Sequence, residues 1–153
     1  ASLRIQAIAH YLPESLFIVT HRNEVDNGHS LLEVRDRVFG NYQTWWSMEP
    51  PETELLKKLP PHEQVIEQIR HIHAVIEKDL LDAGVQAERR FDLSFKEFCS
   101  DPTELVSRLE TFLTKNGCHI YRRMNPPQKF EPREIVRIDK TLYSAMKDYA
   151  SRA

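Results

Sequence analysis

The chain contains a short, continuous apolar run, SLFIVT at residues 15–20, that ends abruptly in polar residues. A run of this length without alternation is typical of a strand buried on both faces, as in a parallel sheet. A parallel partner needs a crossover connection, which is usually a helix. This segment therefore favours an α/β fold, and we expect a second strand at 91–95, where FDLSF alternates as a short strand should.

Helical spacing of apolar residues occupies much of the rest of the sequence. The predicted helices cover residues 2–12, 24–38, 61–83, 102–116 and 132–151, with a short one at 52–59. Residues 41–61, which carry four prolines and two adjacent tryptophans, are expected to form an irregular excursion. The pattern predicts a single, helix-rich α/β domain over residues 1–153. Two parallel strands make a poor sheet on their own, so we interpret the chain as part of a larger domain.

Charge and composition exclude several function classes. The net charge is -2, from 21 basic and 23 acidic residues, which argues against a nucleic-acid binder with a strongly basic surface. No apolar run approaches the roughly 18 residues of a membrane span. Two cysteines cannot build a disulfide framework or a four-cysteine zinc site. The low cysteine count mildly favours the cytoplasm, with the Golgi as the alternative if an N-terminal anchor precedes this segment.

The polar residues after the first predicted strand form a candidate anion site. Arg22 lies just beyond the strand, at the edge where open α/β sheets bind ligands, and Ser30 follows eight residues later on the next helix. A guanidinium and a hydroxyl could converge there on an anion. From spacing alone, a surface arginine and a helix-packing serine are the commoner explanation.

Two longer segments change that weighting. LRIQAIAHYLPESLFIVTHRNEVDNGHSLLEVR has a Leu-Arg-Ile helix, a proline, an apolar strand ending in arginine and a serine eight residues later. FDLSFKEFCSDPTELVSRLETFL has a strand, an aromatic turn, Asp-Pro and an amphipathic helix ending in Phe-Leu. In this order, the segments resemble the PAPS-dependent sulfotransferases, which use 3′-phosphoadenosine 5′-phosphosulfate. The resemblance covers about residues 2–113, with 41–61 unassigned.

The resemblance implies a P-loop-related parallel-sheet fold and a donor site. Arg22 and Ser30 would hold the 3′-phosphate of PAPS, and Phe95 would replace the tyrosine that contacts adenine. Phenylalanine keeps the aromatic face and loses the hydroxyl, so a core strand residue is an equal alternative for Phe95. The family often has Arg-Asp-Pro where this chain has Arg22-Asn23-Glu24. The implied reaction moves a sulfuryl group to a hydroxyl or amine of a carbohydrate or other small molecule, and requires no metal.

The phosphosulfate-binding loop of the family has no counterpart in this sequence. Its four glycines are scattered, and none opens a helix beside a Lys and a Ser or Thr. We therefore interpret the chain as the C-terminal part of a sulfotransferase domain, inactive alone and able to associate through an uncovered sheet edge. The alternative is a non-catalytic helical interaction module or a degenerate sulfotransferase-like fragment.

Several histidines and both tryptophans are candidates for a catalytic, metal-binding or acceptor-binding role, but the sequence assigns none of them. Three histidines fall near the expected donor site and are able to titrate near neutrality, namely His10, His21 and His29. None matches a catalyst of the family, so the catalytic base is unassigned. His71 and His73 lie two apart on a predicted helix and point in different directions, unlike a zinc pair. Trp45 and Trp46 would stack on an acceptor or, more commonly, anchor the excursion.

Overall fold

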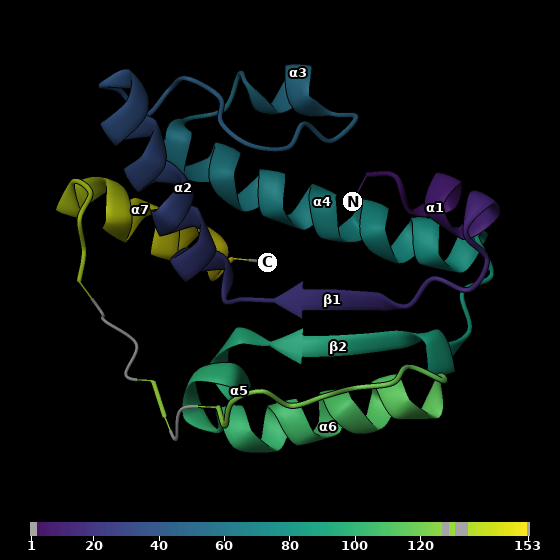
Figure 1. The fold of residues 1–153 in the computed structure, drawn as a ribbon. Coiled ribbons are helices and arrows are strands. Elements are labelled where there is room, and N and C mark those ends of the chain that lie inside the picture. The colour runs from purple at the N-terminus through teal and green to yellow at the C-terminus, as the bar shows by residue number, and fades with distance from the viewer. Residues whose placement is uncertain (1–2, 127–128, 131–134, 153) are drawn as a thin grey trace. The chain divides into compact units, whose positions relative to one another are not determined.

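A computed structural model describes residues 3–126, 129–130 and 135–152 (Figure 1). The protein is mixed α/β and helix-rich, with one small parallel sheet. Its elements in chain order are α1 (Ile5–Tyr11), β1 (Phe17–His21), α2 (Glu24–Phe39), α3 (Thr53–Leu56), α4 (Pro61–Asp82), a 3-10 turn η1 (Ala87–Arg89), β2 (Arg90–Ser94), α5 (Phe95–Ser100), α6 (Pro102–Lys115) and α7 (Lys140–Ala150).

The sheet confirms the expected strands and their parallel direction. Strand β1 pairs with β2 from Phe17 opposite Arg90 to His21 opposite Ser94. The carboxyl ends of both strands therefore lie at the same edge (Figure 1). Within the described part of the chain, these two strands make up the whole sheet.

The chain divides into two compact units, each built from separate segments. The sheet unit contains Gln6–Arg22 and the described residues of Asp82–Glu134. The helical unit contains Asn23–Leu81 and the described residues of Ala1–Ile5 and Ile135–Ala153. The expectation of a single domain stays a prediction.

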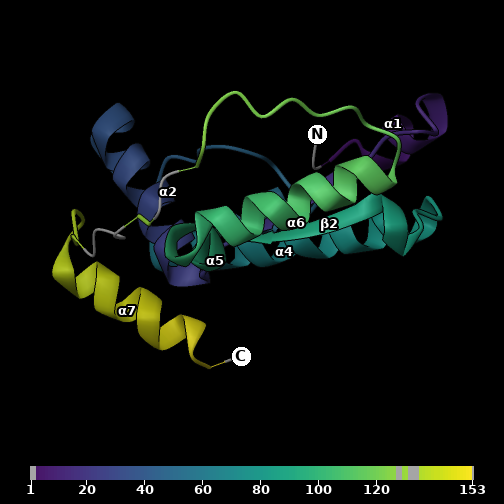
Figure 2. The same cartoon turned by 60° about the horizontal axis from the view of Figure 1, so that its bottom comes forward.

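In the sheet unit, α6 supplies the packing partner of β2, and Figure 2 shows the helix running along that strand. The buried Phe91 ring of β2 lies 5.4 Å from the Phe112 ring of α6, centroid to centroid. Helix α6 begins where the sequence predicts, because the Asp101 side chain accepts a hydrogen bond from the Glu104 amide at 3.0 Å and Pro102 opens the first turn.

In the helical unit, helices α2, α4 and α7 share one apolar core. Its buried members are Leu32, Val65, Ile66 and Met146 from these helices and Ile138 from the segment just before α7. Gly28 of α2 lies close against this core, since a Cβ there would lie 2.9 Å from the Met146 sulfur and 3.1 Å from a Val65 methyl, so a larger residue would make these side chains shift. Helix α2 ends at Gly40, as expected, in a left-handed conformation with φ 68°.

A buried cation fixes the irregular excursion at 41–61 to the helical unit. Arg35 of α2 is fully buried, and its guanidinium donates to the side-chain oxygens of Gln64 at 2.8 Å and Gln68 at 3.2 Å. Burial lowers the pKa of Arg35 to about 10. The three side chains together donate to backbone carbonyls of the excursion, those of Tyr42, Trp46, Met48, Lys57 and Leu59.

Several expected boundaries are wrong: α1 begins at Ile5 rather than at 2, and α3 ends at Leu56 rather than at 59. Two other differences concern α7 and Phe95. Helix α7 begins at Lys140 rather than at 132: Asp139 caps it by accepting from the Leu142 amide at 2.9 Å, and residues 135–139 before it are not helical. Residues 132–134 of that expected helix lie outside the described residues. Phe95 was expected in a strand but opens α5, because Ser94 caps that helix through the Glu97 amide.

Candidate functional site

The carboxyl edge of the sheet brings together two of the three residues expected to bind the donor. Arg22 follows β1 directly, and Phe95 follows β2 directly. The guanidinium carbon of Arg22 lies 4.8 Å from the centroid of the Phe95 ring. The two residues are 73 positions apart in sequence, so the parallel register of β1 and β2 creates their contact.

The Arg22–Phe95 contact places a charge beside an aromatic ring at the carboxyl edge of the sheet. Phe95 is 39% exposed, so the alternative of a core strand phenylalanine is wrong. The arrangement suits a ligand that carries both an anionic group and a flat ring.

Ser30, the third expected residue, belongs to the helical unit. Its hydroxyl donates to the Asp26 carbonyl one turn earlier on α2, at 3.0 Å. That contact is the ordinary back-bonding of a helical serine. The convergence of Ser30 with Arg22 on one ligand stays a prediction.

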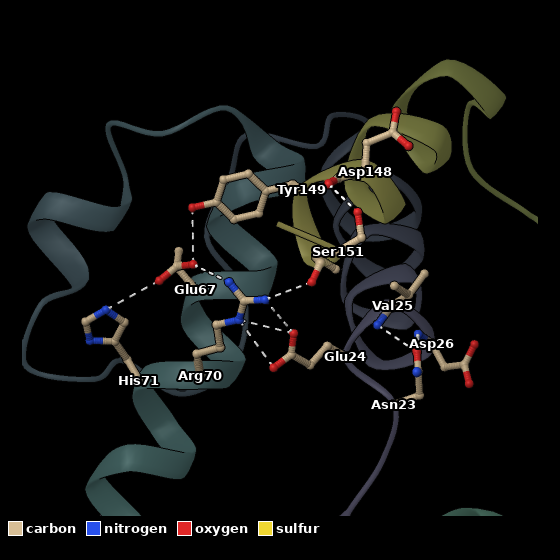
Figure 3. A network of polar contacts seen from close by, with 11 residues as sticks. Asn23, Glu24, Val25, Asp26, Glu67, Arg70, His71, Asp148, Tyr149 and Ser151 are labelled. Atoms are coloured by element: carbon tan, nitrogen blue, oxygen red, sulfur yellow. Dashed lines mark hydrogen bonds and ion pairs between the residues drawn. The ribbon is translucent and has the colours of Figure 1, made fainter. Parts of the chain in front are cut away.

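The turn between β1 and α2 has a defined structural role. The Asn23 side-chain oxygen accepts hydrogen bonds from the amides of Val25 at 2.9 Å and Asp26 at 3.2 Å (Figure 3). Asparagine is a favoured helix N-cap, so this turn residue stabilises the start of α2. Asn23 stands where the sulfotransferases often have the aspartate of Arg-Asp-Pro, and it forms a well-defined helix cap immediately after Arg22.

A second charged cluster lies on the same two strands and was missed from the sequence. The carboxylate of Asp92 accepts from Arg90 at 2.7 and 2.8 Å and lies 2.7 Å from Nε2 of His21. The hydrogen bonds from Arg90 first, and from His21 second, lower the pKa of Asp92. The sequence shows Asp92 as a polar residue inside the alternating run FDLSF, which is the one local indication of this cluster. It does not show the partners of Asp92, because these depend on the register of the two strands.

The helical unit has its own polar network, in which Arg70 of α4 joins three helices (Figure 3). Its guanidinium binds both carboxylate oxygens of Glu24 on α2 at 2.9–3.3 Å, and Glu67 at 3.1 Å. It also donates to the Ala150 carbonyl at the end of α7, at 3.2 Å. The Tyr149 hydroxyl hydrogen-bonds Glu67 at 3.2 Å, so the network fastens α7 to α4.

Both tryptophans contact other side chains of the helical unit, and neither contact indicates stacking on an acceptor substrate. Trp45 is half-buried with its ring 5.3 Å from the Arg35 guanidinium, which indicates an anchor for the excursion. Trp46 is 41% exposed and contacts Phe39 edge to face. His71 lies between the carboxylates of Glu52 and Glu67, an ion-pair environment rather than a ligand set.

The part of the chain that the structure describes contains neither a metal-binding cluster nor a helix that could span a membrane. No cluster of three or more His, Cys, Asp or Glu side chains there has a geometry suited to a metal ion. None of the helices described combines the length and apolarity needed to cross a bilayer.

Comparison with known proteins adds no family assignment. No family model, no curated protein and no solved structure matches the chain.

Proposed function

We propose that the chain is the C-terminal part of a PAPS-dependent sulfotransferase of P-loop-related fold and supplies the 3′-phosphate side of the donor site. In this proposal, Arg22 and Ser30 bind the 3′-phosphate and Phe95 packs against the adenine. The complete enzyme would transfer a sulfuryl group to a hydroxyl or amine of a carbohydrate or other small acceptor.

The contact between Arg22 and Phe95 carries the proposal. The two residues belong to separate sequence motifs, and the guanidinium carbon of Arg22 lies 4.8 Å from the centroid of the Phe95 ring. A charged donor beside an aromatic face matches a nucleotide, which offers a phosphate oxygen and a base. Their position after parallel strands is where α/β sheets bind ligands.

The role of this side of the site is orientation. Sulfuryl transfer depends on holding donor and acceptor in line and on neutralising charge at the leaving phosphate. Arg22 would fix the donor at the phosphate most remote from the reacting sulfur. It would therefore affect donor affinity more than the chemical step.

Titration of the chain with adenosine 3′,5′-bisphosphate, followed by amide NMR shifts, tests the proposal. We expect the Arg22 and Phe95 amides to shift, and Arg22→Ala to weaken binding by roughly 10- to 100-fold, the value of a hydrogen bond to a charged group. Adenosine 5′-phosphate, which lacks the 3′-phosphate, should respond little to the same substitution. Arg37→Ala, which removes an exposed arginine at the end of α2, is the matched control.

Two results would contradict this reasoning. If Arg22→Ala weakened the binding of both nucleotides equally, Arg22 would not bind the 3′-phosphate. No binding of the bisphosphate at millimolar concentration would favour the alternative of a non-catalytic interaction module. We also expect no sulfuryl transfer from labelled PAPS by the chain alone, because its sequence carries no phosphosulfate loop.

A further inference from the structure

Residues 135–139, which we call the strap, run in a non-helical conformation just before α7 and contact α2. The backbone amide of Arg137 donates a hydrogen bond to Nε2 of His29, at a distance of 3.0 Å. The Arg137 guanidinium also pairs with Glu33, one turn further along α2, at 3.0 Å. At the end of the strap, the Asp139 amide donates to the Tyr42 hydroxyl at 3.3 Å.

The bond to His29 depends on the protonation state of the imidazole. A backbone amide is a donor at every pH, so Nε2 accepts only while it carries no proton. The neutral ring in this bond therefore has its proton on Nδ1. In the imidazolium, both ring nitrogens are donors, and Nε2–H would face the Arg137 N–H. Protonation thus replaces an attraction by a repulsion at the centre of the strap.

Charges of both signs surround His29. On α2, Glu33 lies one turn after it and Asp26 one turn before it. From the strap comes the cation of Arg137, and from α7 comes the Tyr143 ring, 5.8 Å away edge to face. Lys147 lies over that same tyrosine ring at 5.8 Å.

We propose that the strap is a pH-sensitive latch, held on α2 by neutral His29 and released when His29 is protonated. Histidine is the side chain whose charge ordinarily changes between pH 5 and 8. Release is local, because α7 keeps the buried Met146 and the contacts of Arg70 with its last turn. The residue uncovered by release is Ile138, which is 6% exposed in the closed strap. This proposal is independent of the proposed function.

Amide hydrogen exchange by NMR tests the latch at pH 7.5 and at pH 5, with each rate expressed relative to the unfolded chain at the same pH. We expect the protection of the Arg137 amide to fall by about five- to tenfold at the lower pH, since one ordinary hydrogen bond is lost. The Tyr143 amide inside α7, bonded to the Asp139 carbonyl, should keep its protection. The Arg137 amide shift should follow the same titration curve as the His29 ring protons.

The variant His29→Gln separates titration from packing. A glutamine oxygen accepts from an amide at every pH, so this variant should keep the strap closed at pH 5 and pH 7.5 alike. His10→Gln, which removes an exposed histidine of the sheet unit, should leave the response of Arg137 unchanged. Protection of Arg137 that is equal at the two pH values in the native chain, or that falls equally in His29→Gln, would overturn the proposal.

Discussion

Replacement of Gln68 by leucine tests how the irregular excursion is held in place. Gln68 is fully buried on α4 and makes three hydrogen bonds. Its oxygen accepts from the Arg35 guanidinium at 3.2 Å, and its amide donates to the carbonyls of Trp46 at 2.9 Å and Met48 at 2.8 Å. Leucine has a similar size and retains none of these bonds.

The size of the effect follows from what is left without a partner. A hydrogen bond to a charged group contributes about 1.5–3 kcal/mol and a neutral one about 0.5–1.5 kcal/mol, with more lost when a buried partner stays unsatisfied. Arg35 cannot escape to water because it is fully buried, whereas the two carbonyls belong to a segment that is able to loosen. We therefore expect Gln68→Leu to lower the free energy of unfolding by about 3–5 kcal/mol.

Urea unfolding followed by tryptophan fluorescence is a suitable assay, because both tryptophans of the chain lie in the excursion. The emission of native Gln68→Leu should also change before global unfolding, as Trp46 loses its backbone anchor. Gln43→Leu, at an exposed position of the same segment, is the matched control and should stay within about 0.5 kcal/mol of the native chain. A loss below about 1 kcal/mol in Gln68→Leu would refute the reasoning.

Three further perturbations probe other contacts. Gly28→Val should lower the free energy of unfolding by about 1–3 kcal/mol, measured in urea, because its side chain collides with Met146, and an unchanged midpoint would contradict the packing. Hydrogen bonds from Arg90 and His21 lower the folded-state pKa of Asp92, so its carboxylate stabilises the fold above about pH 4, and this contribution is lost as the pH falls through the folded pKa. Asp92→Asn should therefore be less stable at pH 7 and show a flatter melting profile between pH 5 and pH 2. Arg70→Met should cost only about 0.5–1.5 kcal/mol, less in high salt, because Glu24 is 39% exposed and solvent screens the pair; a salt-independent loss would point to packing instead.

Elements with local signals could be predicted from the sequence. The continuous run at 15–20 and the alternating run at 91–95 correspond to β1 and β2, each displaced by at most two residues. Helix α6 was predicted almost to the residue, because Asp101 and Pro102 mark its start within the sequence itself. The start of α7 could not be predicted in this way, because the apolar periodicity of the helix continues before Asp139. The backbone amide of Arg137 in that segment bonds to His29 of α2 instead of forming a helical turn.

Contacts between distant positions could not be predicted in the same way. The sequence motifs contain Arg22 and Phe95, but the contact between the two side chains depends on the register of two strands. Arg35 lies near the end of a helix expected from the sequence, and nothing local to it indicates that side chains 29 and 33 positions away bury it fully. The sequence around a polar helix residue such as Arg35 does not indicate which distant side chains hydrogen-bond to it in the folded core.

The discontinuous construction of the helical unit has a consequence for biosynthesis. Its core joins Leu32 and Val65 to Met146, which leaves the ribosome more than one hundred residues after Gly40 ends α2. The sheet unit is complete earlier, once α6 and the residues after it have emerged, and its parallel strands are separated by α2 and α4 along the chain. During translation, the apolar surface that α7 covers on α2 and α4 therefore stays exposed until α7 has been synthesised. Exposed apolar surface of this kind makes a nascent chain prone to aggregation and to binding by chaperones.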